Sequence, residues 1–338
     1  MDFDVARIEE EITKKTYAAG GFMPIGSWGL NVKADQRYYA DTLAYLFKQK
    51  IKPSSPKNAV PTDLFMVQTP RASGLFSDAS LAPDNTTAHW QYLSGGVLTL
   101  FTGWFHVIVH QDKYPARIVI FIREPQYSFT AFRDHLFEVI HKILFIFRRF
   151  YIHAGAVKWR DRICAFVGDR GSGKSTVCLR LAKDGAQIIS DDHILFKKSG
   201  DEFFISGCEE TVRVTEKTEK GLFCSPLSEI QNDYDGVLKK EIFLKDYFDC
   251  IPFQDFPVHD VLFTHVGNAF KVYPISKQQA VINLIEKTKA FFRFNRPEDL
   301  NDYLAYFSQL TSQTRLFDLI LSPDLGDLNK LISFLNCC

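Results

Sequence analysis

Residues Gly168-Asp169-Arg170-Gly171-Ser172-Gly173-Lys174-Ser175, followed by Thr176, match the pattern of a phosphate-binding loop: spaced glycines, then a lysine and a hydroxyl residue. A glycine-rich turn that opens a helix directs several backbone N–H groups at one point, where the helix dipole also favours negative charge. We therefore expect residues 168–176 to bind nucleotide phosphates. Lys174 would contact the outer phosphates, while the hydroxyl of Ser175, or as a weaker candidate that of Thr176, would meet an accompanying magnesium ion.

The residues on both sides of this loop support the interpretation. Ile163–Val167 is an apolar run typical of a buried strand, and it leads directly into the loop. Ser175–Asp184 has apolar residues at helical spacing, with Lys183 in its last turn and Gly185 placed to cap it. The sequence thus predicts a strand, a phosphate-binding loop and a helix in succession.

Composition limits the classes of protein to which the chain can belong. Its 338 residues and 46% hydrophobic content predict two domains with sizeable cores. Forty basic residues balance forty acidic ones, so no bulk charge favours nucleic acid or an anionic membrane. The longest apolar runs are too short, or too interrupted by charge, to span a bilayer. We expect neither a nucleic-acid partner nor a membrane partner.

Cysteine usage and the start of the chain bear on the compartment. The seven cysteines are odd in number, and no pair has metal-ligand spacing, which fits a reducing environment. The acidic start Met1-Asp2-Phe3-Asp4 lacks the basic and apolar regions of a secretory signal. A cytoplasmic location is therefore expected.

The first 149 residues carry no catalytic motif and predict a smaller α+β accessory domain. Thr130–Phe150 has apolar residues at three- and four-residue steps and predicts a long helix ending at the domain junction. Pro-, Ser- and Asn-rich composition predicts loops at Lys52–Pro61 and Ser77–Thr87. An antiparallel meander is predicted from three apolar runs, Gly96–Thr102, Phe105–His110 and Arg117–Arg123.

Residues 150–338 predict a second domain, in which short strands are followed by helices. The predicted strands are Ile188–Ile189, Ile194–Phe196, Phe203–Ser206, Val261–Val266, Lys271–Tyr273 and Arg315–Leu321, and the helices are Lys277–Lys289, Pro297–Leu310 and Leu325–Leu335. We expect a hairpin turn at residues 198–201. Val261–Val266 and Lys271–Tyr273 are expected to pair with each other.

An acidic pair, Asp191 and Asp192, follows an apolar strand seventeen and eighteen residues after Lys174. Phosphoryl transfer needs charge neutralisation by a metal ion and a group that orients or deprotonates the acceptor hydroxyl. Two adjacent carboxylates can divide these tasks, although coupled acids are not separated by sequence. Glu209 and Glu210 rank below this pair as metal-binding residues.

Three segments together resemble the kinase domain of HPr kinase/phosphorylase, and most of all its divergent serine-kinase relatives. They are His153-Ala154-Gly155-Ala156-Val157, the phosphate-binding loop fifteen residues after His153, and Ser190-Asp191-Asp192. The resemblance covers about residues 150–335. It implies an α/β (α+β) fold like the nucleotide-binding part of phosphoenolpyruvate carboxykinase, with a phosphate-binding loop on a mixed sheet, preceded here by the α+β accessory domain.

The resemblance also implies roles for the site residues. Asp191 would be the acceptor base, Asp192 with Ser175 would hold Mg²⁺, and Lys174 would bind ATP. His153 would lie near the transferred phosphate, where an imidazolium stabilises charge or tunes a neighbouring carboxylate; a hydrogen-bonded structural histidine is the other interpretation. Arg213, Lys239 and Lys240 are further candidates for steadying charge, although solvated surface charges are common.

The sequence departs from true HPr kinases after the acidic pair, where Gly207–Val214 replaces their glycine-rich segment. This difference argues against HPr as the acceptor. We expect an ATP- and Mg²⁺-dependent kinase acting on another hydroxyl, such as the serine of a protein, a ribosomal precursor peptide or a small molecule. Family resemblance also suggests a homo-oligomer.

Other functions compete with the kinase interpretation. A nucleotide-binding regulator would bind ATP without transferring phosphate. A carboxykinase-like enzyme is disfavoured because no second constellation of metal-binding His and Lys residues is evident. A mechanical ATPase is disfavoured because no apolar strand ends in an acidic residue at the longer spacing of such motors.

Overall fold

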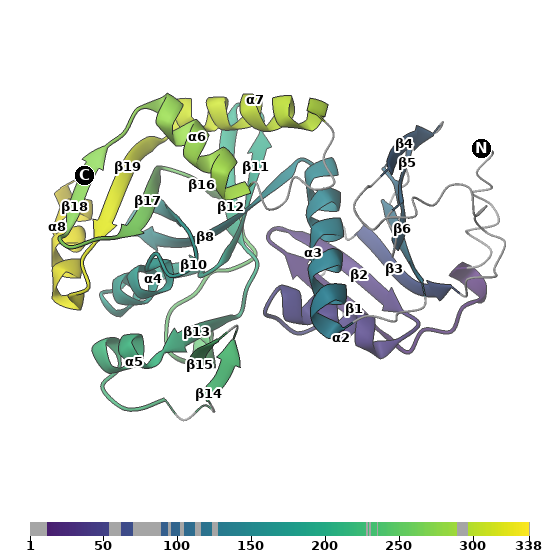
Figure 1. Ribbon diagram of the computed structural model, residues 1–338, viewed down its shortest axis with the longest axis horizontal. Helices are drawn as coiled ribbons and strands as arrows, with labels where there is room; N and C mark the ends of the chain where they lie inside the picture. Colours follow the sequence, from purple (N-terminus) through teal and green to yellow (C-terminus); the bar gives the residue numbers. More distant parts are fainter. Residues whose placement is uncertain are drawn as a thin grey trace. The chain divides into compact units, whose positions relative to one another are not determined.

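The computed structural model describes residues 12–53, 62–69, 89–93, 96–101, 105–111, 116–123, 128–227, 229, 231–234, 236–288 and 297–337. The chain divides by its internal contacts into two compact units, Met1–Ile143 and Leu144–Cys338 (Figure 1). Both are mixed α/β. The sequence placed a boundary between residues 149 and 150, whereas the observed division falls inside helix α3 (Phe129–Ile146). Apart from residues 52 and 53, the two predicted loops 52–61 and 77–87 lie outside the described residues.

The first unit contains a seven-stranded mixed sheet in the order β1-β2-β3-β7-β6-β5-β4. The predicted meander is confirmed, because β5, β6 and β7 are successive antiparallel neighbours. The β1–β2 hairpin and helix α2 (Arg37–Leu46) were not predicted. The strands are β1 (Ala19–Ile25), β2 (Trp28–Ala34), β3 (Thr62–Thr69), β4 (His89–Leu93), β5 (Val97–Phe101), β6 (Phe105–His110) and β7 (Arg117–Arg123).

Helix α3 ends at Ile146, so the predicted end at Phe150 is wrong. Arg148 has a φ of 55°, a left-handed backbone conformation that does not continue a helix. Phe150 instead belongs to strand β8 (Arg149–Trp159). Apolar residues continue without a break from the helix into the strand, and for this reason the helical spacing did not reveal where the helix stops.

The second unit contains a nine-stranded mixed sheet. Eight strands follow the order β16-β12-β11-β8-β9-β17-β19-β18, and β10 also pairs with β8. Strands β9, β17 and β19 are parallel neighbours, while β8 is antiparallel to β9, β10 and β11. The further strands are β9 (Arg162–Val167), β10 (Gln187–Ser190), β11 (His193–Ser199), β12 (Glu202–Gly207), β16 (Phe256–Pro257), β17 (Asp260–Val266), β18 (Lys271–Pro274) and β19 (Arg315–Leu321).

Strands β17 and β18 do not pair, so that part of the prediction is wrong. Strand β19 lies between them, parallel to β17 and antiparallel to β18. The side chains of β17 are mostly buried, whereas those of β18 are mostly exposed, as suits an edge strand. The short separation of β17 and β18 along the chain favours a hairpin between them. The apolar side chains of β19, however, are removed from water more fully when β19 lies inside the sheet than at its edge.

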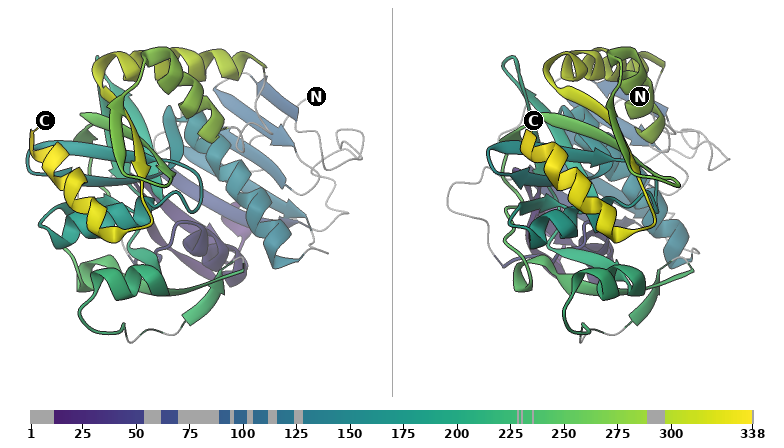
Figure 2. Two further views of the ribbon diagram at one scale, coloured as in Figure 1. Left: turned by 60° about the vertical axis from the view of Figure 1, so that its left-hand side comes forward. Right: turned by 90° about the vertical axis from the view of Figure 1, so that its left-hand side faces the viewer.

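Helices cover both faces of this sheet. One face packs against α6 (Lys277–Thr288) and α7 (Pro297–Gln313). The other packs against α4 (Lys174–Lys183) and α8 (Leu328–Cys337), which follows the short helix η4 (Leu325–Asp327). Helices α4 and α8 lie side by side (Figure 2). The Arg180 guanidinium of α4 donates a hydrogen bond to the side-chain oxygen of Asn329 in α8, at 2.7 Å. No helix among the described residues has the length and apolar character needed to cross a membrane.

A small antiparallel sheet, in the order β13-β15-β14, forms a separate layer in the second unit. Its apolar side chains pack on Leu179 of α4 and Ile188 of β10. Its elements are β13 (Thr211–Thr215), α5 (Glu216–Leu222), β14 (Gln231–Tyr234), β15 (Val237–Phe243) and the short helix η2 (Leu244–Asp246). Arg213 forms an ion pair with Glu241 at 2.9 Å, and Lys240 forms one with Glu219 at 2.8 Å. Both cations are thus engaged in ion pairs within this layer.

The stability of the second unit should depend on the protonation of His259. Its Nδ1 accepts a hydrogen bond from the backbone N–H of Ile163 at 3.0 Å, and burial lowers its pKa below the ordinary 6.5. The unfolded chain then binds the proton first as the pH falls, so the free energy of unfolding should decrease below about pH 6.5 until the folded pKa is reached. His259→Asn keeps an acceptor without titrating. Unfolding of both proteins from about pH 5 to 8 tests this, and parallel profiles would contradict it.

Candidate active site

The glycine-rich loop lies between β9 and α4, as the sequence predicts. Gly171 and Gly173 have φ values of 81° and 93°, which non-glycine residues rarely adopt. At Gly168 a Cβ atom would lie 2.5 Å from the Ser172 hydroxyl, so this position has no room for a side chain. The loop residues Asp169 and Arg170 are exposed, and Ser175 and Thr176 lie half-buried in the first turn of α4.

Lys174 is held close to the loop backbone. Its side chain is buried, and Nζ donates hydrogen bonds to the carbonyl oxygens of Gly168 and Asp169, both at 2.9 Å. Burial lowers the pKa of Lys174 below the ordinary 10.5, while the charges of Asp192 and Asp191 act in the opposite direction. The helix that carries Lys174 comes close to the acidic turn at Gly155 of β8, where a Cβ atom would lie 2.6 Å from Cys178 Sγ of α4 and 3.1 Å from the carbonyl oxygen of Asp191.

Hydroxyl groups from other elements brace the loop. The Thr264 side chain of β17 lies 2.9 Å from the Ser172 hydroxyl and donates to the carbonyl oxygen of Val167 at 3.2 Å. On α4, the Thr176 hydroxyl lies 3.1 Å from that of Thr218 in α5. Nothing in the local sequence indicated Thr264, because it reaches the loop only through the parallel pairing of β9 and β17.

The acidic pair forms the turn between β10 and β11. Both strands pair with β8, and the register shifts between Ile188 and Ser190, where the chain bends into the turn. Asp191 is buried and Asp192 is half-buried. On the neighbouring β8, His153 Nδ1 lies 2.8 Å from a carboxylate oxygen of Asp192. His153 therefore meets one member of the acidic pair directly.

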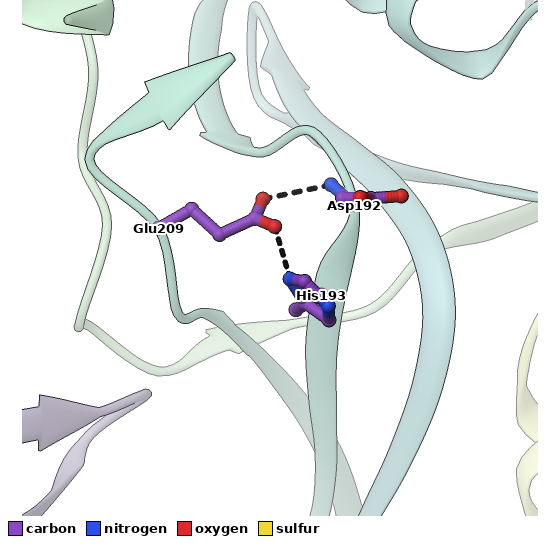
Figure 3. Close-up of side chains that lie close together, drawn as sticks. All are labelled: Asp192, His193 and Glu209. Carbon is purple, nitrogen blue, oxygen red and sulfur yellow. Dashed lines mark hydrogen bonds and ion pairs between the residues drawn. The ribbon is translucent and has the colours of Figure 1, made fainter. Parts of the chain in front are cut away.

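Glu209 organises this turn from the segment after β12. Its side chain is fully buried, and Oε2 accepts hydrogen bonds from the Ser190 hydroxyl at 3.1 Å and from the backbone N–H groups of Asp191 and Asp192 at 3.1 and 2.8 Å. Its other oxygen contacts Nδ1 of His193 (Figure 3). One carboxylate thus fixes the backbone of both aspartates.

Asp192, His193 and Glu209 each place a potential metal-ligating atom within 4.8 Å of the others. The predicted metal site paired Asp192 with Ser175 instead. Both oxygens of Glu209 already accept hydrogen bonds from the turn and from His193, which suits a structural carboxylate better than a metal ligand. Of the three, Asp192 has the donor type and the partial exposure that Mg²⁺ requires.

We expect Glu209→Gln to destabilise the second unit by about 2 kcal/mol, because hydrogen bonds to a buried charge are lost and an amide N–H₂ can face backbone donors. Chemical denaturation of the purified proteins measures this change. Glu202→Gln, which changes an exposed glutamate at the start of β12, is the matched control. Equal stability of the two variants would remove Glu209 from this role.

The importance of Glu209 and His193 was largely missed from the sequence. From the sequence, Glu209 ranks below the acidic pair as a metal-binding residue, and His193 is not singled out. A buried glutamate is rare unless it is paired, but burial becomes visible only when β12 is placed beside β11.

Comparisons with known proteins give little further guidance. No protein-family model matches the chain, and no curated protein matches it. Among solved structures, the chain is similar to the Hpr(Ser) kinase/phosphatase from Coxiella burnetii, with 13% identity and a TM-score of 0.28. The similarity covers 55% of this chain and 92% of that one.

Proposed function

We propose that the second unit is an ATP- and Mg²⁺-dependent phosphotransferase that moves the γ-phosphate to a hydroxyl group. The observation that carries the proposal is that Lys174 lies on a glycine-rich turn opening α4, and that α4 and the acidic turn meet at Gly155 of β8, where a Cβ atom would lie 2.6 Å from Cys178 Sγ of α4 and 3.1 Å from the Asp191 carbonyl oxygen. An anion-binding helix start next to two carboxylates supplies both the phosphate site and the groups that handle metal and proton.

The phosphate-binding part of the proposal rests on α4 and its loop. Backbone N–H groups at the start of α4 and the Lys174 ammonium would bind the β- and γ-phosphates of ATP. An ammonium has three N–H donors, two of which bond the carbonyls of Gly168 and Asp169. The third can be directed at a phosphate while these bonds keep the group in place.

Asp191 is the proposed base. It would accept the proton of the acceptor hydroxyl as the bond between that oxygen and the γ-phosphorus forms and the bond to the β-phosphate oxygen breaks. ADP leaves with the electron pair of the broken bond. The Asp191 side chain is buried, and Glu209 holds its backbone in place.

Ser175 and Asp192 are the residues proposed to hold Mg²⁺, since both offer oxygen atoms and are partly exposed. The ion would neutralise phosphate charge. His153 would orient the carboxylate of Asp192 through their 2.8 Å contact. The acceptor proposed is a serine hydroxyl in a protein, a peptide or a small molecule.

We also propose that this sheet is of the carboxykinase-like type. The strand that leads into the loop, β9, has a parallel neighbour in β17 and an antiparallel one in β8. Typical P-loop NTPases surround that strand with parallel neighbours, so the mixed arrangement favours the proposed assignment.

The test is incubation of the purified 338-residue chain with γ-labelled ATP, Mg²⁺, a cell lysate and free serine. Wild type, Lys174→Ala and Asp191→Asn are compared, and the labelled product is identified by mass. Label on a serine-containing acceptor with wild type alone supports the proposal. ATP binding that is unchanged in Asp191→Asn, without transfer by any of the three proteins, would favour a nucleotide-binding regulator instead.

A further inference from the structure

A second lysine, Lys287, reaches the phosphate-binding loop from the last turn of α6. Its Nζ lies 2.6 Å from the carboxylate of Asp169, although 118 residues separate the two in the sequence. The carbonyl oxygen of the same Asp169 accepts the hydrogen bond from Lys174 at 2.9 Å. A single loop residue therefore contacts both ammonium groups, which places Lys287 and Lys174 beside the same end of the loop.

The two partners of this ion pair differ in their freedom to move. The Lys287 side chain is only 17% exposed, whereas that of Asp169 is 76% exposed. On α6, the neighbouring Leu284 and Thr288 are fully buried, and the Thr288 hydroxyl bonds the carbonyl oxygen of Leu284 at 3.1 Å. The stem of Lys287 is thus fixed to the core, while its carboxylate partner lies in solvent and can turn away.

Electrostatics favour replacing the Asp169 carboxylate by a phosphate group as the partner of Lys287. A carboxylate in a phosphate-binding loop repels a polyphosphate, whereas an ammonium attracts it. A phosphate group of a nucleotide carries more charge and more acceptor oxygens than the carboxylate of Asp169, so it competes well for a lysine at the same distance. The observed pair has the geometry of a cation held in position beside the loop.

We propose that Lys287 is a second phosphate-binding lysine. Its Nζ exchanges the carboxylate of Asp169 for a terminal phosphate oxygen of the bound nucleotide, so that α6 and α4 hold the same polyphosphate from two sides of the loop. This inference rests on the proposed function and deepens it. No covalent step is involved, and the test needs no acceptor.

Calorimetric titration of the 338-residue chain with Mg·ATP and with magnesium tripolyphosphate tests the proposal. Lys287→Met should weaken the binding of both ligands by about ten- to a hundredfold, since it removes a charge-assisted contact and keeps the length of the side chain. The loss should be equal for the two ligands because the nucleoside is not involved. Lys277→Met, at the exposed start of the same helix, should bind like wild type.

The double variant Asp169→Asn/Lys287→Met separates direct contact from neutralisation of Asp169. If Lys287 touches phosphate, the double variant stays weak; recovery of wild-type affinity would overturn the inference and leave Lys287 as a partner of Asp169. Wild-type affinity in Lys287→Met would overturn it as well. Lys287→Arg, which keeps the charge, should retain most of the affinity. This result would show that the loss in Lys287→Met comes from the missing charge and not from misfolding. Failure of the wild type to bind either ligand would instead defeat the proposed function.

Discussion

Replacing Lys174 with alanine is expected to lower the affinity for Mg·ATP by about a hundredfold or more and to abolish phosphate transfer. The ammonium is buried against the loop, where its charge is weakly screened and its position is fixed by the carbonyls of Gly168 and Asp169. Removing one preorganised donor from such a site typically costs two to three orders of magnitude in rate, and roughly comparable losses follow in binding to a charged ligand.

Calorimetry for binding and labelled-phosphate transfer for activity measure the two effects of Lys174→Ala. Lys183→Ala, at the exposed end of the same helix, is the control. Since burial lowers the pKa of Lys174, the wild-type affinity should also decline at an alkaline pH below 10.5, as the ammonium loses its proton. Unchanged affinity in Lys174→Ala would show that the loop does not bind nucleotide through this residue.

Replacing Asp191 with asparagine is expected to reduce phosphate transfer by about 10²- to 10⁴-fold while ATP binding stays within a few-fold of wild type. The amide has nearly the same size and keeps the backbone N–H that bonds Glu209, so the turn should be preserved. What is lost is the ability to accept a proton. The separation of the transfer rate from binding is the signature of a base.

The control for this prediction is Asp201→Asn, which changes an exposed carboxylate in the turn after β11. Asp192→Asn provides the comparison inside the site: if Asp192 holds Mg²⁺, its loss should be reduced by raising the Mg²⁺ concentration, whereas the loss in Asp191→Asn should not. Full transfer activity in Asp191→Asn, or rescue of that variant by Mg²⁺, would refute the assignment of the base.

The parts of the site that lie in one short segment were predictable from the sequence. Gly171 and Gly173 are needed because the backbone there is left-handed, and a local sequence pattern reveals such a requirement. Gly168 fits the same pattern, although part of the close packing that excludes a side chain there comes from Thr264 of β17. The apolar runs before and after the loop likewise predicted β9 and α4 to within a residue or two. The mixed α/β character followed from the same kind of evidence.

What the sequence did not reveal depends on contacts between distant segments. Thr264 and Lys287 reach the loop across parallel strands and from a packed helix, and neither stands in a motif. Strand β19 lies between β17 and β18 because this order buries the apolar side chains of β19, although β17 and β18 are closer to each other along the chain. The sequence around Glu209 does not distinguish it from a surface acid. It contacts the acidic turn only because β12, which precedes it, pairs with β11.

The pairing of strand β8 limits which insertions and deletions the site can tolerate. It pairs with three strands at once, so His153 lies opposite His193 of β11, Ala154 opposite Val167 of β9, and Ala156 opposite Ser190 of β10. Side chains alternate between the two faces of a strand, so a one-residue deletion in β8 would turn His153 away from Asp192. Strand β8 therefore sets the spacing between the phosphate-binding loop, which follows β9, and the acidic turn, which joins β10 to β11. Under the proposed function, we expect differences in acceptor preference to arise in segments outside β8, where a change of length leaves the spacing of the loop and the acidic turn unchanged.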